Sequence, residues 1–123
     1  PDVVRVLFAS APSRVALVTD AMAAAGSADG EYSLGGLEVE VRAGVARLAE
    51  GGAIAGSTLT QDAALRVAVA AGAPLPIAVQ ALTSAPAAAV GRPDLGTLAV
   101  GALADAVLLD ADLQVRRVWT AGV

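Results

Sequence analysis

The continuous apolar run Val15-Ala-Leu-Val18, which ends in Thr19-Asp20, constrains the fold more than any other stretch of this chain. A helix is expected before it, because apolar residues within 2–11 recur on one helical face and Pro12 ends the pattern. A short apolar run between turn residues is typical of a strand buried on both faces, as in a parallel sheet. A helix followed by a buried strand indicates an α/β fold.

Further segments show either the alternation typical of strands or the start and end signals of helices. Leu37-Glu-Val-Glu-Val41 alternates apolar and polar residues, and Val45-Ala-Arg-Leu48 follows across a glycine-containing turn, which predicts a half-exposed hairpin. Proline, glycine and cap residues then predict three helices and, after Pro93, three strands. The predicted helices cover 59–71, 76–83 and 84–91, and the predicted strands cover 97–99, 106–109 and 115–119.

Composition excludes several classes of function. The 123 residues carry a net charge of −4, and the eight arginines are dispersed without any lysine, so no basic surface for nucleic acid is expected. Cysteine and histidine are absent, which removes thiolate metal sites and the commonest general base. The most apolar zone, 63–90, is broken by Arg66, Gln80 and three prolines, so it cannot span a membrane. A soluble, cytoplasmic protein is expected.

Asp20 is the first candidate for chemistry. In a parallel α/β protein, ligands bind at the carboxyl ends of the strands, where a carboxylate is both held rigidly and exposed to substrate. The same residue could instead cap the turn or helix that follows it. The residue pattern alone leaves both interpretations open.

The stretch from Gly96 to Asp110 consists of a strand, a glycine turn, an Ala-Asp pair and a second strand. Asp105 and Asp110 need be no more than turn carboxylates. As a string, the stretch resembles the C-terminal signature of the metal-dependent amidohydrolase superfamily, although Ala102 stands where a basic residue is usual.

Three further stretches resemble the N-acetylglucosamine-6-phosphate deacetylase family, in order and in spacing: Leu17–Gly26, Tyr32–Gly36 and Ile54–Thr60. The resemblance extends over essentially the whole chain. It implies an α/β fold in which residues 1–93 are the C-terminal part of a (β/α)₈ TIM barrel with a β-hairpin insertion at about 31–50. Residues 94–123 would be strands of a small β-sandwich domain.

The resemblance also implies roles for individual residues. Asp20 matches the family's catalytic aspartate, which takes a proton from a metal-activated water and delivers it to the departing amine. Residues Ile54, Ala55, Gly56 and Ser57 match a loop that contacts the substrate sugar. The family more often has serine at the position of Ala55, so a contact there would be through the backbone, whereas Ser57 could donate or accept a hydrogen bond.

By the same resemblance, the cofactor is a divalent metal, zinc or iron, and its glutamate and histidine ligands lie upstream of Pro1. No metal ligand is therefore expected in this chain, which alone is expected to be inactive. The complete enzyme would convert N-acetylglucosamine 6-phosphate to glucosamine 6-phosphate and acetate. The expected partners are this phosphorylated amino sugar, the missing N-terminal part of the barrel and a second copy in a homodimer.

Two alternatives remain. The chain could be a segment of another amidohydrolase, similar to a dihydroorotase or hydantoinase, which would share the strand-terminal aspartate and the Gly-Ala-Asp tail. It could also be a non-catalytic interaction module, consistent with the absence of histidine. Upstream sequence would separate them, since a His-x-His pair near its start favours the hydantoinase-like group.

Overall fold

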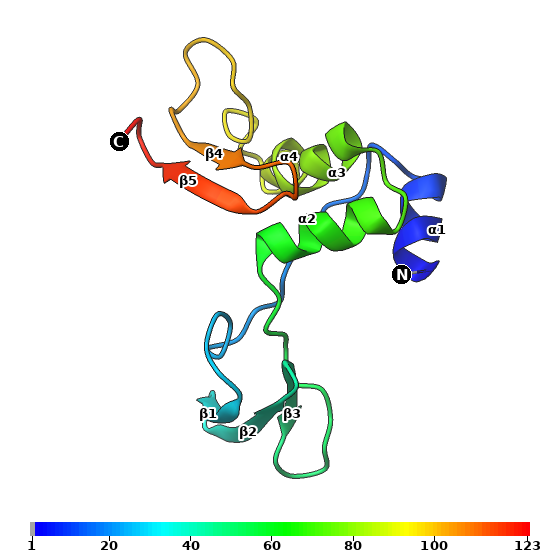
Figure 1. Cartoon of the computed structure of the whole chain (residues 1–123), viewed down its shortest axis with the longest axis vertical. Helices are drawn as coiled ribbons and strands as arrows, with labels where there is room; N and C mark the ends of the chain where they lie inside the picture. Colours follow the sequence, from blue (N-terminus) through cyan, green and yellow to red (C-terminus); the bar gives the residue numbers. More distant parts are fainter. Residues whose placement is uncertain (1) are drawn as a thin grey trace. The chain divides into compact units, whose positions relative to one another are not determined.

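The structure is a computed structural model that describes residues 2–123 (Figure 1). Its backbone forms two compact units: one contains residues 2–17 and 62–123, and the other contains Val18–Gln61. The helices of the first unit are α1 (Asp2–Ser10), α2 (Gln61–Ala70), α3 (Leu75–Leu82) and α4 (Ser84–Ala89). Its strands are β4 (Ala106–Leu109) and β5 (Val115–Trp119). The first residue of α2, Gln61, is counted with the second unit. The second unit holds β1 (Gly30–Leu34), β2 (Leu37–Arg42) and β3 (Val45–Leu48).

The four predicted helices are confirmed, each within two residues of its predicted ends. α3 has Pro76 in its first turn, where the missing N–H leaves no helical hydrogen bond unmade. Buried alanines dominate the core of this unit, together with Phe8 and Leu65. Small side chains let the helices approach closely, which explains how a chain almost without aromatic residues packs a core.

β4 and β5 pair antiparallel, with the bounds that the sequence predicted. The Asp110 carboxylate accepts the backbone N–H groups of Asp112 and Gln114, each at 2.9 Å, and the Arg116 guanidinium at 2.8 Å. Asp105 likewise accepts the N–H of Ala121 at 2.8 Å. Both aspartates are therefore turn carboxylates, as predicted.

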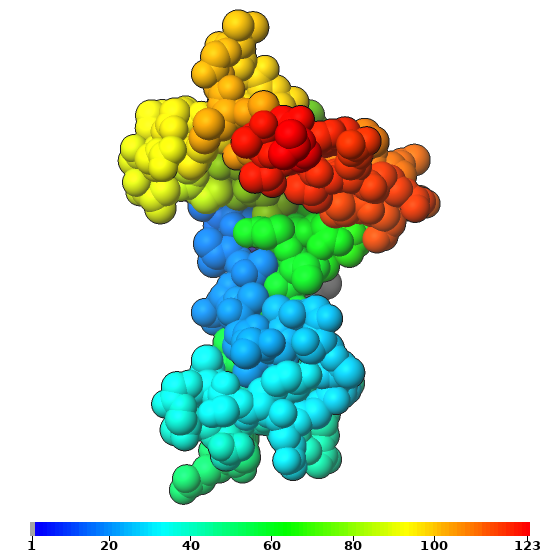
Figure 2. All heavy atoms as spheres, turned by 90° about the vertical axis from the view of Figure 1, so that its left-hand side faces the viewer, coloured from blue at the N-terminus to red at the C-terminus, as the bar shows by residue number. Residues whose placement is uncertain are grey.

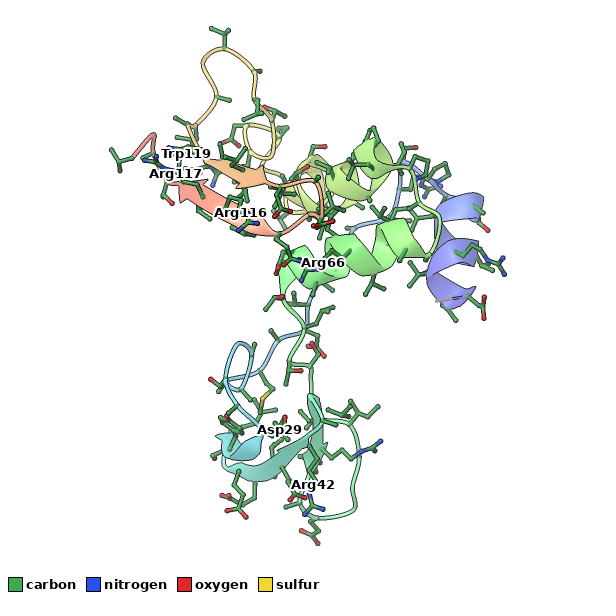
Figure 3. All side chains as sticks on the ribbon, in the orientation of Figure 1. Asp29, Arg42, Arg66, Arg116, Arg117 and Trp119 are labelled. Atoms are coloured by element: carbon green, nitrogen blue, oxygen red, sulfur yellow. The ribbon has the colours of Figure 1, made fainter. Side chains whose placement is uncertain are left out.

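Arg66 ties helix α2 to the loop that precedes β5. Its Nη1 donates to the carbonyl oxygen of Leu113 at 3.1 Å and to the Asp62 carboxylate at 2.8 Å (Figure 3). Leu109 and Leu113 also pack against the helical core. The hairpin thus belongs to the same compact unit as the helices, and the division of the chain into 1–93 and 94–123 stays a prediction.

The predicted strand at 97–99 is wrong. Residues 92–104 form turns and loop between α4 and β4. Part of this segment projects from the surface, in yellow to orange (Figure 2). The side chain of Leu98 is 86% exposed. The segment has strand-like residues but pairs with no strand among residues 2–123, and a strand needs a hydrogen-bonded neighbour.

The second unit is built on an antiparallel sheet of order β1-β2-β3. Val39 and Val41 of β2 point to the buried face together with Ala46 of β3, so the period-two pattern correctly predicts this hairpin. The strand β1, which pairs with β2 from Gly30↔Val41 to Leu34↔Leu37, is not predicted by the sequence. Its glycine and few apolar residues give a weak strand signal.

The predicted buried strand at 15–18 is also wrong. The segment is extended but unpaired, and Val18 is 71% exposed. Its anchor is the N–H of Leu17, which donates to the carbonyl oxygen of Ala81 at 2.7 Å. β-branched residues favour an extended backbone, but no neighbouring strand within residues 2–123 completes a sheet around this one.

No helix within residues 2–123 combines the length and the apolar character needed to cross a bilayer.

Candidate active site

Asp20 lies where the extended segment ends. Its backbone has a φ of +50°, in the left-handed region that residues other than glycine rarely adopt. The side chain is exposed, and its carboxylate forms no hydrogen bond or ion pair with any residue from 2 to 123. A bridge at Ala21 and a turn follow, without a helix. The cap interpretation is therefore wrong, because the carboxylate accepts no backbone N–H in the part of the chain that the structure describes.

The predicted substrate loop, residues 54–57, contacts the sheet at one end and the segment that contains Asp20 at the other. Ile54 forms an antiparallel bridge with Arg47 of β3, and Ser57 forms a parallel bridge with Ala21. The N–H of Ser57 donates to the carbonyl oxygen of Asp20 at 2.8 Å, and the N–H of Met22 donates back to the carbonyl oxygen of Ser57 at 2.8 Å. Residues distant in sequence therefore form one short ladder.

Gly56 lies where the two segments pass close to each other. A Cβ atom on it would lie 3.0 Å from the carbonyl oxygen of Asp20 and 3.5 Å from Cβ of Met22. Its φ of +63° is a second reason for glycine at this position. The absence of a side chain at Gly56 therefore lets this loop pass close to the backbone of Asp20.

The Ser57 hydroxyl is already engaged. It donates to the carbonyl oxygen of Thr19 at 2.6 Å and accepts the N–H of Leu59 at 3.0 Å. A hydroxyl has one proton to donate, so this arrangement leaves Ser57 no donor for a sugar.

The other two residues of the predicted loop have different surroundings. Ile54 is 69% exposed. Ala55 is buried in the core of the second unit, and its N–H donates to the carbonyl oxygen of Ala46 at 3.0 Å. The structure therefore brings Asp20, Gly56 and Ser57 together and turns Ala55 inward. The backbone oxygen of Thr19, which accepts the Ser57 hydroxyl, also belongs to this arrangement, and a main-chain contact of this kind leaves no signature in the sequence.

No group of three or more histidine, cysteine, aspartate or glutamate side chains converges on a common point within residues 2–123. Asp20 supplies a single carboxylate, so the residues around it do not form the donor set of a metal site by themselves. A surface hollow of about 630 Å³ is lined by residues 36–38 and 48–50. It includes none of the predicted site residues and therefore does not mark this site.

Comparison with known proteins agrees with the residue-level similarity. An N-acetylgalactosamine-6-phosphate deacetylase of Escherichia coli is 44% identical over 114 residues, which are 91% of this chain and 30% of that protein. An N-acetylglucosamine-6-phosphate deacetylase of Caenorhabditis elegans is 36% identical over 120 residues, 96% of this chain and 29% of that protein. The chain thus spans about three-tenths of the length of these relatives.

A solved structure with a similar backbone is a mutant N-acetyl-D-glucosamine-6-phosphate deacetylase of Mycobacterium smegmatis in complex with N-acetyl-D-glucosamine-6-phosphate. Its TM-score is 0.91 at 47% identity, and the match covers 98% of this chain and 33% of that one. The sequence pattern of the Amidohydrolase family matches residues 9–123. This chain therefore belongs to the amidohydrolase family.

Proposed function

We propose that this chain is part of a deacetylase that removes the acetyl group from N-acetylglucosamine 6-phosphate, giving glucosamine 6-phosphate and acetate. The observation that carries the proposal is the match to the M. smegmatis enzyme, which has its phosphorylated amino sugar bound, over 98% of this chain. The carboxylate of Asp20, which has no hydrogen-bond or ion-pair partner among residues 2–123, is the candidate for the proton transfers of this reaction.

Asp20 would serve twice in this reaction. As a water oxygen bonds to the acetamide carbonyl carbon, the carboxylate accepts a proton from that water. The protonated Asp20 then delivers the proton to the nitrogen as the carbon–nitrogen bond breaks, which releases the amine and acetate. A base of this kind must be accessible and free of competing hydrogen bonds. The side chain of Asp20 is exposed and forms no hydrogen bond with any residue from 2 to 123, which supports this role.

Members of the amidohydrolase family generally use a divalent metal. Among residues 2–123 no group of three or more potential ligands converges, so the proposal places the zinc or iron on residues outside this range. We therefore assign no step of the reaction to a metal held by this chain.

The proposed architecture is the C-terminal part of a (β/α)₈ TIM barrel with strands of a small β-sandwich. It would explain why apolar side chains remain open to solvent on α1, with Val3 and Leu7 as examples, and on the β4–β5 hairpin, with Val107 and Leu108. The homodimer stays a prediction, which light scattering of the complete protein tests.

The experiment is a measurement of acetate and free amine released by the complete purified protein from N-acetylglucosamine 6-phosphate. The 4-epimer, N-acetylgalactosamine 6-phosphate, is the second candidate, because a relative at 44% identity is named for it. A higher kcat/KM for the glucosamine substrate supports the proposal, and a higher value for the epimer assigns the activity to the second candidate.

Dihydroorotate and hydantoin serve as controls for the other amidohydrolase activities. Hydrolysis of either one in place of the two acetamido sugars would contradict the proposal. Absence of hydrolysis with all four compounds, in a folded, metal-loaded protein, would favour a non-catalytic module.

A further inference from the structure

Two peptide groups determine the conformation of Asp20. The Thr19–Asp20 peptide lies on one side of its Cα atom and the Asp20–Ala21 peptide on the other, so the orientations of these two planes fix φ and ψ. They also fix the direction in which Cβ, and with it the carboxylate, leaves the backbone. Contacts that hold both peptide planes therefore determine the direction of the Asp20 carboxylate.

Ser57 holds both planes. Its hydroxyl donates to the Thr19 carbonyl oxygen at 2.6 Å, and its N–H donates to the Asp20 carbonyl oxygen at 2.8 Å. Its own carbonyl oxygen accepts the N–H of Met22 at 2.8 Å. One residue from a distant part of the sequence thus fixes the backbone on both sides of Asp20.

The conformation needs such support. A left-handed backbone is unfavourable for an L-residue relative to the right-handed helical region, and it persists where surrounding contacts over-determine it. At φ +50° Asp20 is in that region. The hydroxyl of Ser57 is itself held, because it accepts the N–H of Leu59 at 3.0 Å.

From these contacts we infer that Ser57 is a positioning residue, which aims the Asp20 carboxylate through the backbone and does not bind the sugar with its hydroxyl. The inference rests on the proposed function, since it assumes that Asp20 is the acid and base. It assigns Ser57 a role different from the substrate contact that the sequence resemblance implies.

The test compares hydroxyl-deleting variants in the complete, metal-loaded enzyme. Ser57→Ala removes the bond to Thr19 and keeps both backbone bonds. Misplacement of a catalytic group by an ångström can lower the rate by ~10²-fold, so we expect kcat to fall by roughly 10- to 100-fold while KM changes less than about twofold. Ser57→Thr retains the hydroxyl and should restore most of kcat. Ser57→Cys, with a weaker donor of similar size, should fall between the two.

Thr58→Val is the matched control. The Thr58 hydroxyl is on the neighbouring residue of the same loop but donates to the carbonyl oxygen of Gly44, away from Asp20. Its loss should lower the urea midpoint, as Ser57→Ala does, and leave kcat unchanged. An equal fall of kcat in Thr58→Val would overturn the inference, because general loosening of the loop would then explain both.

A double-mutant cycle separates the inference from the proposed function. In an Asp20→Asn background, Ser57→Ala should lower the residual kcat by less than about twofold, because the group that it positions is already gone. If Ser57→Ala lowered kcat by the same factor in the Asp20→Asn background as in the wild type, or raised KM alone, the positioning role would be overturned and a substrate contact indicated. Normal activity of Asp20→Asn itself would instead contradict the proposed function.

Discussion

The hydroxyl of Ser57 and the carbonyl oxygen of Thr19 are joined by a 2.6 Å hydrogen bond across 38 positions of the chain. The three strands of the second unit lie between these positions in the sequence. The sheet therefore closes the loop that brings the residues together, and its stability should influence the geometry of Asp20.

Gly56→Ala should destabilise this unit more than Gly26→Ala does. Both glycines have positive φ, so alanine is strained by roughly 1–2 kcal/mol at either position. Only at Gly56 would the new Cβ meet a backbone oxygen, at 3.0 Å, whereas Gly26 has nothing within 4 Å. We expect an additional loss of about 1 kcal/mol in the free energy of unfolding, measured with urea. Equal losses would contradict the close approach of Gly56 to Asp20.

Ala43→Asn should stabilise the β2–β3 hairpin. Ala43 and Gly44 have φ of +50° and +73°, the pattern of a type I′ turn, in which Asn-Gly is preferred. Asparagine tolerates this region better than alanine, so a gain of about 0.5–1 kcal/mol is expected in the free energy of unfolding. Ala23→Asn, in an exposed turn without positive φ, is the control and should give no gain. A loss of stability in Ala43→Asn would show that the turn has another geometry.

Acid should weaken the β4–β5 hairpin. Hydrogen bonds from the backbone N–H groups of Gln114 and Asp112, together with Arg116, lower the pKa of Asp110 below its ordinary value of 3.8. A carboxyl whose folded pKa is depressed stabilises the folded state above its unfolded pKa, and this contribution is lost as the pH falls through the folded pKa.

The measurement is the free energy of unfolding between pH 6 and pH 2, in the wild type and in Asp110→Asn. The variant should lose less stability over the acid range, because the amide of asparagine takes up no proton between pH 6 and pH 2. Asp94, whose pKa is lowered by its hydrogen bond with Arg92, contributes to the same fall, so Asp94→Asn gives the comparison for an ion pair in a loop. A pH dependence of the unfolding free energy in Asp110→Asn equal to that of the wild type would show that Asp110 does not contribute to the acid sensitivity.

Local signals predicted most of the secondary structure. Prolines and glycines determine where the helices begin and end, and alternation in 37–41 and 45–48 correctly predicted β2 and β3. The two wrong strands, at 15–18 and 97–99, share one cause. Their residues favour an extended backbone, but a strand is a property of two segments, and neither finds a partner among residues 2–123.

The candidate site was only partly predictable. Asp20 and Gly56 were identified from sequence, and the structure brings their backbones into contact. The engagement of the Ser57 hydroxyl was missed because its partner is a main-chain oxygen, which every residue carries. The burial of Ala55 depends on the sheet that packs around it, and a short window of sequence does not contain that information.

The most direct test of the account is the kcat of Asp20→Asn in the complete enzyme with N-acetylglucosamine 6-phosphate. The substitution keeps the size of the side chain but removes its ability to accept and deliver the proton. General acid–base catalysis contributes typically ~10²–10⁴-fold, so we expect a loss of at least about 10²-fold with KM and the urea midpoint little changed. Asp112→Asn, at an exposed turn residue, should retain wild-type kcat. Near-normal deacetylation by Asp20→Asn would contradict the catalytic role of Asp20.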